Sequence, residues 1–318
     1  VYTSAGLIRL AVFAVVCVAL GVGLLFALFA PCVNPAFMNE MLFYPELIGP
    51  GPNSSIPELG FPAEFNHAWE KMEHRWDETA FDHLHMTAPE DVKFKTADGI
   101  TLHGWMFATP KAKDTVLFNW NAINDMRVPL LLGYVKVLQD AGLNVFMYDL
   151  RGFGSSEGRS ATLATFKIDG QAAYDYLVNE RHIKPENVIL MGSQLGAHLA
   201  LEQYAHHGGK ALILECPWTN LKSWVDEVPA AQAMMLVPKE FYPDGAFDNE
   251  HFLTGKHAPV LFVITTPLPN HGELLYEHAS EPKAQTSLQY ARKLDIPLLS
   301  SEAGKYTEQI KGFLNKKQ

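Results

Sequence analysis

The stretch NVILMGSQLGAHLALEQYAHH, residues 187–207, contains a short apolar run followed at once by a helical segment. The run NVILMG (187–192) predicts a buried strand, and the rest predicts a helix from about Gln194 to His207. A strand that is apolar throughout is typical of sheets whose two faces are both covered by helices. This unit therefore favours an α/β fold.

Similar units flank this one in both directions along the chain. The other predicted strands are 92–96 and 101–107, which form an antiparallel hairpin through the turn Ala97-Asp98-Gly99, then 115–119, 143–150, 211–216, 258–264 and 296–301. The other predicted helices cover about 128–140, 162–180 and 305–317. Because apolar strands alternate with helices, we expect a mostly parallel sheet with helices on both faces.

Composition limits the classes of protein that fit this chain. Its 318 residues are 48% hydrophobic and 19% charged, which supports a buried core and excludes global disorder. The net charge of −10, without a cluster of Lys or Arg, argues against binding to nucleic acid. Cys17, Cys32 and Cys216 lack the spacing of a disulfide framework or a metal site. His83 and His85 have no third ligand nearby, so we assign no metal and no cofactor.

A membrane segment is predicted near the start of the chain. Leu10 to Ala30 are 21 consecutive residues without a charge, and about 20 apolar residues are enough to cross a bilayer. The apolar region of a cleaved signal peptide is shorter, about 7–15 residues. We therefore predict a single-pass anchor in contact with the lipid bilayer. Arg9 precedes it and acidic residues follow it, which places the large domain on the translocated side.

The anchor suggests a division of the chain into three parts. We predict a transmembrane anchor over 1–34, a Pro- and Gly-rich connector with a short amphipathic helix over 35–90, and a main domain over 91–318. The sequence begins at Val1 rather than Met, so either an upstream targeting piece has been removed or the sequence lacks its start. On the first interpretation the location is an organellar inner membrane, which we take to be mitochondrial.

Several motifs of the main domain occur together in one known superfamily. They are LFYP (42–45), TADGITLHGW (96–105), DLRGFGSSEGR (149–159), Gly192 with Gly196, ECPWTNLKSW (215–224) and APVLFV (258–263). In this order and spacing, over about residues 42 to 316, the chain resembles the α/β-hydrolase superfamily. The most similar branch carries one N-terminal transmembrane anchor. The resemblance implies an α/β-hydrolase fold and a Ser-His-Asp triad.

The resemblance places the nucleophile at Gln194. Members of the superfamily carry a nucleophile elbow, G-x-S-x-G, and the matching residues here are Gly192-Ser193-Gln194-Leu195-Gly196. A carboxamide has no hydroxyl to deprotonate, so Gln194 cannot form an acyl-enzyme. Ser193 stands one residue early, and we expect its side chain to point away from the position of the nucleophile.

The other catalytic positions implied by the resemblance depart from the pattern as well. The acid position falls near Leu268, and the base position, after Glu302-Ala303-Gly304, falls on Lys305. An ammonium group cannot replace an imidazole as proton shuttle without a large fall of its pKa. The oxyanion loop matches Asn119, Trp120 and Asn121, where bulky residues are expected to crowd the cavity for a tetrahedral intermediate.

Three functions are compatible with these residues. The first is a catalytically inactive accessory subunit of a membrane complex, in contact with other subunits. The second is a binding module that holds a small molecule or lipid in the old pocket, with Asn119, Gln194 and Lys305 at its rim. The third is an enzyme that uses unrelated residues. Since one scaffold hosts many functions, the site must decide among them.

Overall fold

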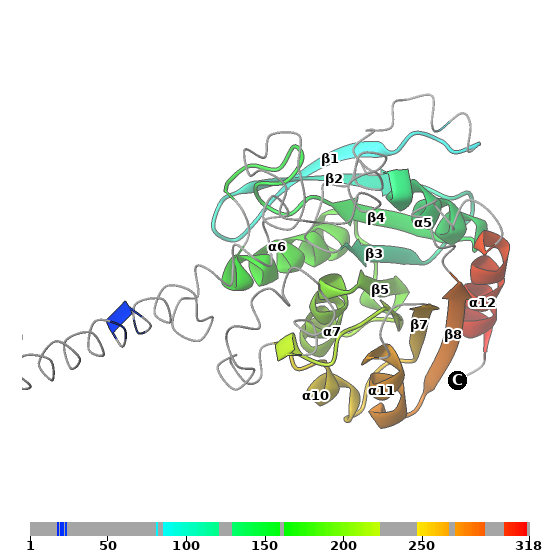
Figure 1. The fold of residues 1–318 in the computed structure, drawn as a ribbon. Helices are drawn as coiled ribbons and strands as arrows, with labels where there is room; N and C mark the ends of the chain where they lie inside the picture. Colours follow the sequence, from blue (N-terminus) through cyan, green and yellow to red (C-terminus); the bar gives the residue numbers. More distant parts are fainter. Residues whose placement is uncertain are drawn as a thin grey trace, which may run out of the picture.

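The computed structural model describes residues 18, 20, 21, 23, 81, 85–120, 129–159, 162–222, 247–266, 271–289 and 302–316. Within these ranges the chain forms one eight-stranded sheet with helices on both faces (Figure 1). The strands are β1 (Glu90–Lys95), β2 (Thr101–Phe107), β3 (Thr115–Asn119), β4 (Asn144–Tyr148), β5 (Val188–Ser193), β6 (Ala211–Glu215), β7 (Val260–Thr266) and β8 (Lys283–Gln289). Their order across the sheet is β1-β2-β4-β3-β5-β6-β7-β8.

The sheet is antiparallel at one edge and parallel elsewhere. Strands β1, β2 and β4 pair antiparallel, whereas β4, β3, β5, β6, β7 and β8 pair parallel. Parallel strands bring their carboxyl ends to one edge, where ligand sites of α/β folds are found. Asn119, Ser193 and Glu215 end three neighbouring strands at this edge.

The helices divide into two layers, one on each face of the sheet. They are α5 (Pro129–Asp140), α6 (Leu163–Asp175) with a π-helical turn (Tyr176–Glu180), α7 (Leu195–His207), α10 (Asn249–Leu253), α11 (His271–His278) and α12 (Ala303–Asn315). Helices α6, α7, α10 and α11 lie on one side of the sheet, and α5 and α12 on the other (Figure 1). Apolar residues of each group form a separate core cluster with the sheet. Both faces are thus covered, which explains why β3, β5 and β6 are buried at every position.

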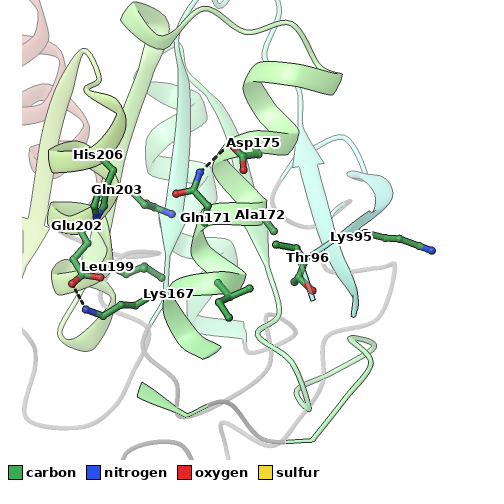
Figure 2. A pocket seen from close by; sticks show the side chains of 12 residues that line it. Lys95, Thr96, Lys167, Gln171, Ala172, Asp175, Leu199, Glu202, Gln203 and His206 are labelled. Atoms are coloured by element: carbon green, nitrogen blue, oxygen red, sulfur yellow. Dashed lines mark hydrogen bonds and ion pairs between the residues drawn. The ribbon is translucent and has the colours of Figure 1, made fainter. Parts of the chain in front are cut away.

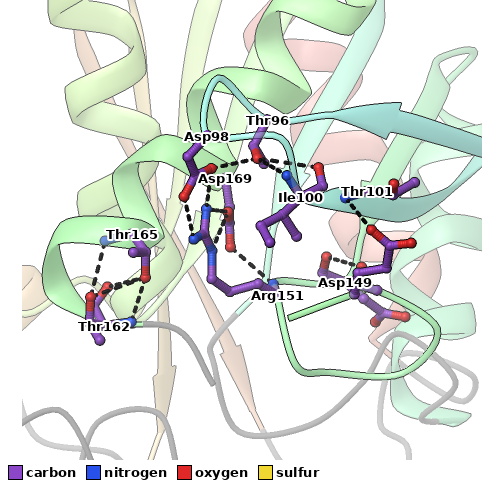
Figure 3. Close-up of polar contacts among 11 residues, drawn as sticks. Thr96, Asp98, Ile100, Thr101, Asp149, Arg151, Thr162, Thr165 and Asp169 are labelled. Atoms are coloured by element: carbon purple, nitrogen blue, oxygen red, sulfur yellow. Dashed lines mark hydrogen bonds and ion pairs between the residues drawn. The ribbon is translucent and has the colours of Figure 1, made fainter. Parts of the chain in front are cut away.

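The loop after β4 joins the hairpin to helix α6. Arg151 donates to both carboxylate oxygens of Asp98, at 2.7 and 3.0 Å, and to Asp169 of α6 through Nε at 2.9 Å and Nη2 at 2.7 Å (Figure 3). The start of α6 is fixed by a capping box between Thr162 and Thr165. Arg151 holds the pKa of Asp98 well below its usual range. These contacts lock the antiparallel edge of the sheet to the α6 face.

The predicted fold class is confirmed for the described residues. Every predicted strand up to 258–264 is present to within a few residues, as are the helices over 128–140, 162–180 and 194–207. The sequence did not predict β8 or α11. In β8, KAQTSLQ, only Thr286 and Leu288 are buried among the side chains described, because it is the last strand of this sheet and exposes one face.

Three predicted segments lie wholly or mostly outside the described residues. They are the strand predicted over 296–301, the short amphipathic helix of the connector, and most of the anchor from Leu10 to Ala30. Four residues of the anchor are described; all four are helical and exposed, with Val18 and Leu20 the two large apolar ones. In the parts of the chain that the structure describes, no helix is both long and apolar enough to cross a membrane.

Candidate functional site

The turn between β5 and α7 has the geometry of a nucleophile elbow. Gln194 has φ 51° and ψ −111°, a backbone conformation that non-glycine residues rarely adopt and that occurs mainly at functional sites. Its N–H donates to the carbonyl of Glu215 at 2.9 Å, and its carbonyl accepts from Ala197 at 3.1 Å. The side chain at the sharpest point of this turn is therefore the half-buried carboxamide of Gln194.

The elbow requires glycine on both sides. A Cβ atom on Gly192 would lie 2.1 Å from the carbonyl oxygen of Gly196, and one on Gly196 would lie 2.0 Å from that of Asn119. Both neighbours are backbone atoms, so no side-chain movement could relieve the overlap. The two glycines are thus explained by the tight turn, whichever residue stands at its centre.

Asn119, which the second interpretation of the sequence places at the rim of a pocket, belongs to a buried hydrogen-bond network. Its side chain is buried and donates to Gln203 Oε1 at 2.8 Å and to the Met191 carbonyl at 3.3 Å, while its Oδ1 accepts from the hydroxyl of Tyr148 at 2.9 Å. Gln203 in turn donates to the carbonyl of Gly170 at 2.7 Å. The side chain of Asn119 therefore takes part in a hydrogen-bond network in the core, because Asn119 is the last residue of β3 and faces α6 and α7.

Trp120 packs on the opposite face of the sheet. Its ring centroid lies 5.9 Å from that of Phe118 and 5.8 Å from that of Tyr134 on α5. The ring thus packs against aromatic side chains on the α5 side of the core. The rest of the oxyanion loop lies outside the described residues, so crowding of an oxyanion cavity by this ring stays a prediction.

Lys305 lies in a helix rather than after a turn. Helix α12 begins at Ala303, two residues earlier than expected, so Lys305 occupies its first turn. Its ammonium donates to the carbonyl of Ser287 on β8 at 2.7 Å and to Glu302 at 3.2 Å. The structure thus gives Lys305 a role in joining α12 to β8. Leu268 and Asn121, the predicted acid and oxyanion positions, lie outside the described residues.

A buried carboxylate that the sequence pattern did not reveal lies next to the elbow. Glu215 ends β6, pairs in register with Ser193, and is 2% exposed. Its Oε1 accepts a hydrogen bond from the hydroxyl of Tyr134. Burial and the nearby charge of Glu215 raise the pKa of the fully buried Tyr306 well above its usual value. The sign of Glu215 in the sequence is that an acidic residue ends the otherwise apolar run ALILE.

The described residues offer no cluster of metal ligands, and the serine of the elbow is buried. In those ranges, no three His, Cys, Asp or Glu side chains lie close enough together to hold a metal ion. Ser193 is buried at 4% exposure in the last position of β5. The elbow thus presents the carboxamide of Gln194, with the hydroxyl of Ser193 inside the sheet.

Comparison with protein families identifies the scaffold. The family model described as serine aminopeptidase, S33, matches residues 131–293, about half of the chain and including the elbow. The chain belongs to this hydrolase family. The α/β-hydrolase superfamily expected from the sequence motifs is therefore confirmed, as part of the same assignment.

Individual relatives are similar over about two thirds of this chain. The uncharacterized protein YfhR of Salmonella typhi is 27% identical over 61% of this chain and 70% of its own length. Human α/β hydrolase domain-containing protein 17B is 27% identical over 65% of this chain and 68% of its own length. Protein bem46 of Schizosaccharomyces pombe is 28% identical over 60% of this chain and 57% of its own length.

Solved structures agree with the fold. An esterase of Pyrococcus furiosus, Pf2001, superposes with a TM-score of 0.58 at 16% identity, covering 76% of this chain and 94% of that one. An α/β hydrolase of Vibrio vulnificus gives a TM-score of 0.59 at 22% identity, covering 79% and 91%. At these identities the similarity establishes the fold, and the chemistry rests on the residues of the elbow.

Proposed function

We propose that this chain is a catalytically inactive member of its hydrolase family, acting as a membrane-anchored accessory subunit in a membrane protein complex. The observation that carries the proposal is Gln194 at the centre of an intact elbow. An amide is a very poor nucleophile and has no proton that a base could remove near neutral pH. The scaffold is retained around a position that cannot start acyl transfer.

The neighbouring residues support the proposal. Asn119 and Trp120 are taken up by core contacts on opposite faces of the sheet, and Lys305 bonds to Ser287 and Glu302. The sequence holds no histidine after His278, where the family places its base. Loss of one catalytic residue can be compensated by a neighbour, but triad members act as a unit.

The first test is the variant Gln194→Ser. We expect its hydrolysis of a p-nitrophenyl ester to stay at the level of Gln194→Ala, because a serine at the elbow still lacks a histidine to take its proton. The matched alanine variant controls for changes of the turn that are unrelated to a nucleophile. Turnover by the serine variant at ten times that of the alanine variant or more would show that a base is present and would contradict the proposal.

The membrane anchor is the second part of the proposal. It rests on the uncharged stretch from Leu10 to Ala30 and on the exposure of the helical residues Val18 (66%) and Leu20 (68%). Apolar side chains presented on a helix surface gain stability when lipid or protein covers them. An accessory subunit fits a chain whose large domain has kept its fold and lost its nucleophile.

Membrane extraction tests the anchor. We expect the full chain to stay in the membrane pellet after high salt and after alkaline carbonate, because charge screening does not release an apolar helix from lipid. Release into the supernatant by carbonate would contradict the anchor. Gentle detergent purification, followed by identification of the chains that co-purify in fixed ratio, then tests the accessory role. A chain that purifies alone and monomeric would contradict that role.

A second candidate is an enzyme with other catalytic residues. The hydrolase family and the esterase among the similar structures favour it. Labelling with a fluorophosphonate probe, which reacts with activated serines, separates it from the first proposal.

A further inference from the structure

A cavity of about 320 Å³ lies one helical turn beyond the elbow, on the face of the sheet covered by α6, α7 and α10. Its walls come from all three helices and their ends. They include Leu163 and Lys167 of α6, His198 and Glu202 of α7, and Phe247 and Phe252 next to and within α10. The cavity therefore combines aromatic walls with titratable side chains, none of which the elbow uses.

The imidazole of His198 has a fixed orientation at the base of this cavity. Asn249 donates through Nδ2 to the carbonyl of Trp218 at 2.6 Å, so its Oδ1 is the atom that faces His198 Nδ1 at 2.8 Å. An amide oxygen only accepts, so Nδ1 carries the hydrogen. The other ring nitrogen, Nε2, then lies 3.4 Å from Glu202 Oε1. The ring of His198 is thus buried and forms one wall of the cavity, next to the carboxylate of Glu202.

Glu202 supplies the negative charge of the cavity. Burial alone would raise the pKa of Glu202, but hydrogen bonds from His198 and Lys167 outweigh it and hold the pKa below its ordinary value. The Glu202 side chain is 13% exposed, whereas that of Lys167 is 51% exposed. The same ion pair borders a larger neighbouring cavity of about 460 Å³ (Figure 2). Lys167 therefore reaches the carboxylate from solvent and can be displaced.

A cation that binds here must take the place of Lys167 on Glu202. The lysine end of this ion pair is exposed to water, which screens its charge, whereas the glutamate end is largely buried. Without the lysine ammonium, Glu202 keeps its contact with His198 and loses its ion pair, while Asp248 and His251 line the same cavity. A cation is the ligand that would restore this ion pair.

The aromatic walls define the rest of such a ligand. The ring of Phe247 lies 4.9 Å from the His198 ring and that of Phe252 lies 5.9 Å from it, both edge to face. Aromatic faces attract organic cations and cover apolar groups. We propose that the cavity binds a small organic ammonium ion, whose charged group replaces that of Lys167 on Glu202 and whose apolar body packs against Phe247 and Phe252. This site is independent of whether the elbow catalyses a reaction.

Benzylamine is a suitable probe, measured by titration calorimetry on the full chain in detergent with protein-free detergent as blank. We expect benzylamine to bind at least ten-fold more tightly than benzyl alcohol, which has the same ring without the charge. The variant Glu202→Gln should weaken binding about ten-fold. The variant Lys167→Met should tighten binding roughly two- to five-fold, because it removes the competing ammonium.

The matched control is Lys136→Met. Lys136 pairs with Asp140 on α5, on the opposite face of the sheet, and its loss changes the net charge equally. The Lys136→Met variant should bind benzylamine with the same affinity as the parent chain. Equal tightening by both lysine variants, no tightening by Lys167→Met, or equal affinity for benzyl alcohol would overturn the proposal. Tighter binding of Nα-acetyl-lysine amide than of benzylamine would assign the cavity to a partner protein's lysine and would also overturn it.

Discussion

Replacing Gly196 by alanine is expected to destabilise the folded state strongly. The added Cβ atom would lie 2.0 Å from the carbonyl oxygen of Asn119, 2.7 Å from its carbonyl carbon and 2.9 Å from the carbonyl oxygen of Trp120. All three are backbone atoms, so β3 and α7 would have to separate. We expect a loss of stability above the about 1–3 kcal/mol typical of overpacked cores, measured by thermal unfolding of the detergent-solubilised chain.

Gly312 offers the matched control for this substitution. It lies in α12, where an added Cβ atom would meet nothing within 4 Å. Gly312→Ala should stabilise the chain by about 0.5–1 kcal/mol, because alanine is the better helix former. A Gly196→Ala chain that melts within a few degrees of the parent would show that β3 and α7 are not in the contact described.

The second large effect is expected for Arg151→Met. The variant leaves Asp169, which is fully buried, without its main partner, and an uncompensated buried charge costs about 3–5 kcal/mol. Burial raises the pKa of Asp169, and hydrogen bonds from Arg151 oppose this effect in the parent chain. The midpoint of thermal unfolding at neutral pH should therefore fall by several degrees or more.

The double variant Arg151→Met with Asp169→Asn separates charge from packing. A neutral amide has no charge to leave uncompensated, so the double variant should recover most of the lost stability. Asp98 should have little influence, since it is exposed to solvent and can be hydrated. If the double variant were as unstable as Arg151→Met alone, the loss would come from packing of the arginine stem and not from the carboxylate.

Most of the fold could be predicted because each parallel strand is buried on both faces. Runs such as TVLFN (115–119) and NVILMG (187–192) are apolar between their ends and too short for a helix, which favours buried strands. Strand β8 could not be predicted in the same way. Its neighbour β7 supplies backbone hydrogen bonds that a partly exposed strand needs whatever its side chains are.

The sequence predicts those features of the site that the backbone conformation determines. Gly192, Gln194 and Gly196 occupy the expected elbow because the turn itself requires its glycines. The contacts of Asn119, Trp120 and Lys305 could not be predicted, because they depend on which face a side chain takes and where a helix begins. A shift of one residue at the end of a strand, or two at a helix start, moves a side chain to another surface. Such shifts are set by tertiary packing.

The central claim, that the elbow holds no nucleophile, is tested most directly with a fluorophosphonate probe. The reagent labels serines activated by a neighbouring base. We predict no labelling of the intact chain above that of the heat-denatured chain, as detected by mass spectrometry, because Gln194 stands where the serine should be. Stoichiometric labelling of the folded chain at Ser193 or at any other serine would contradict the account.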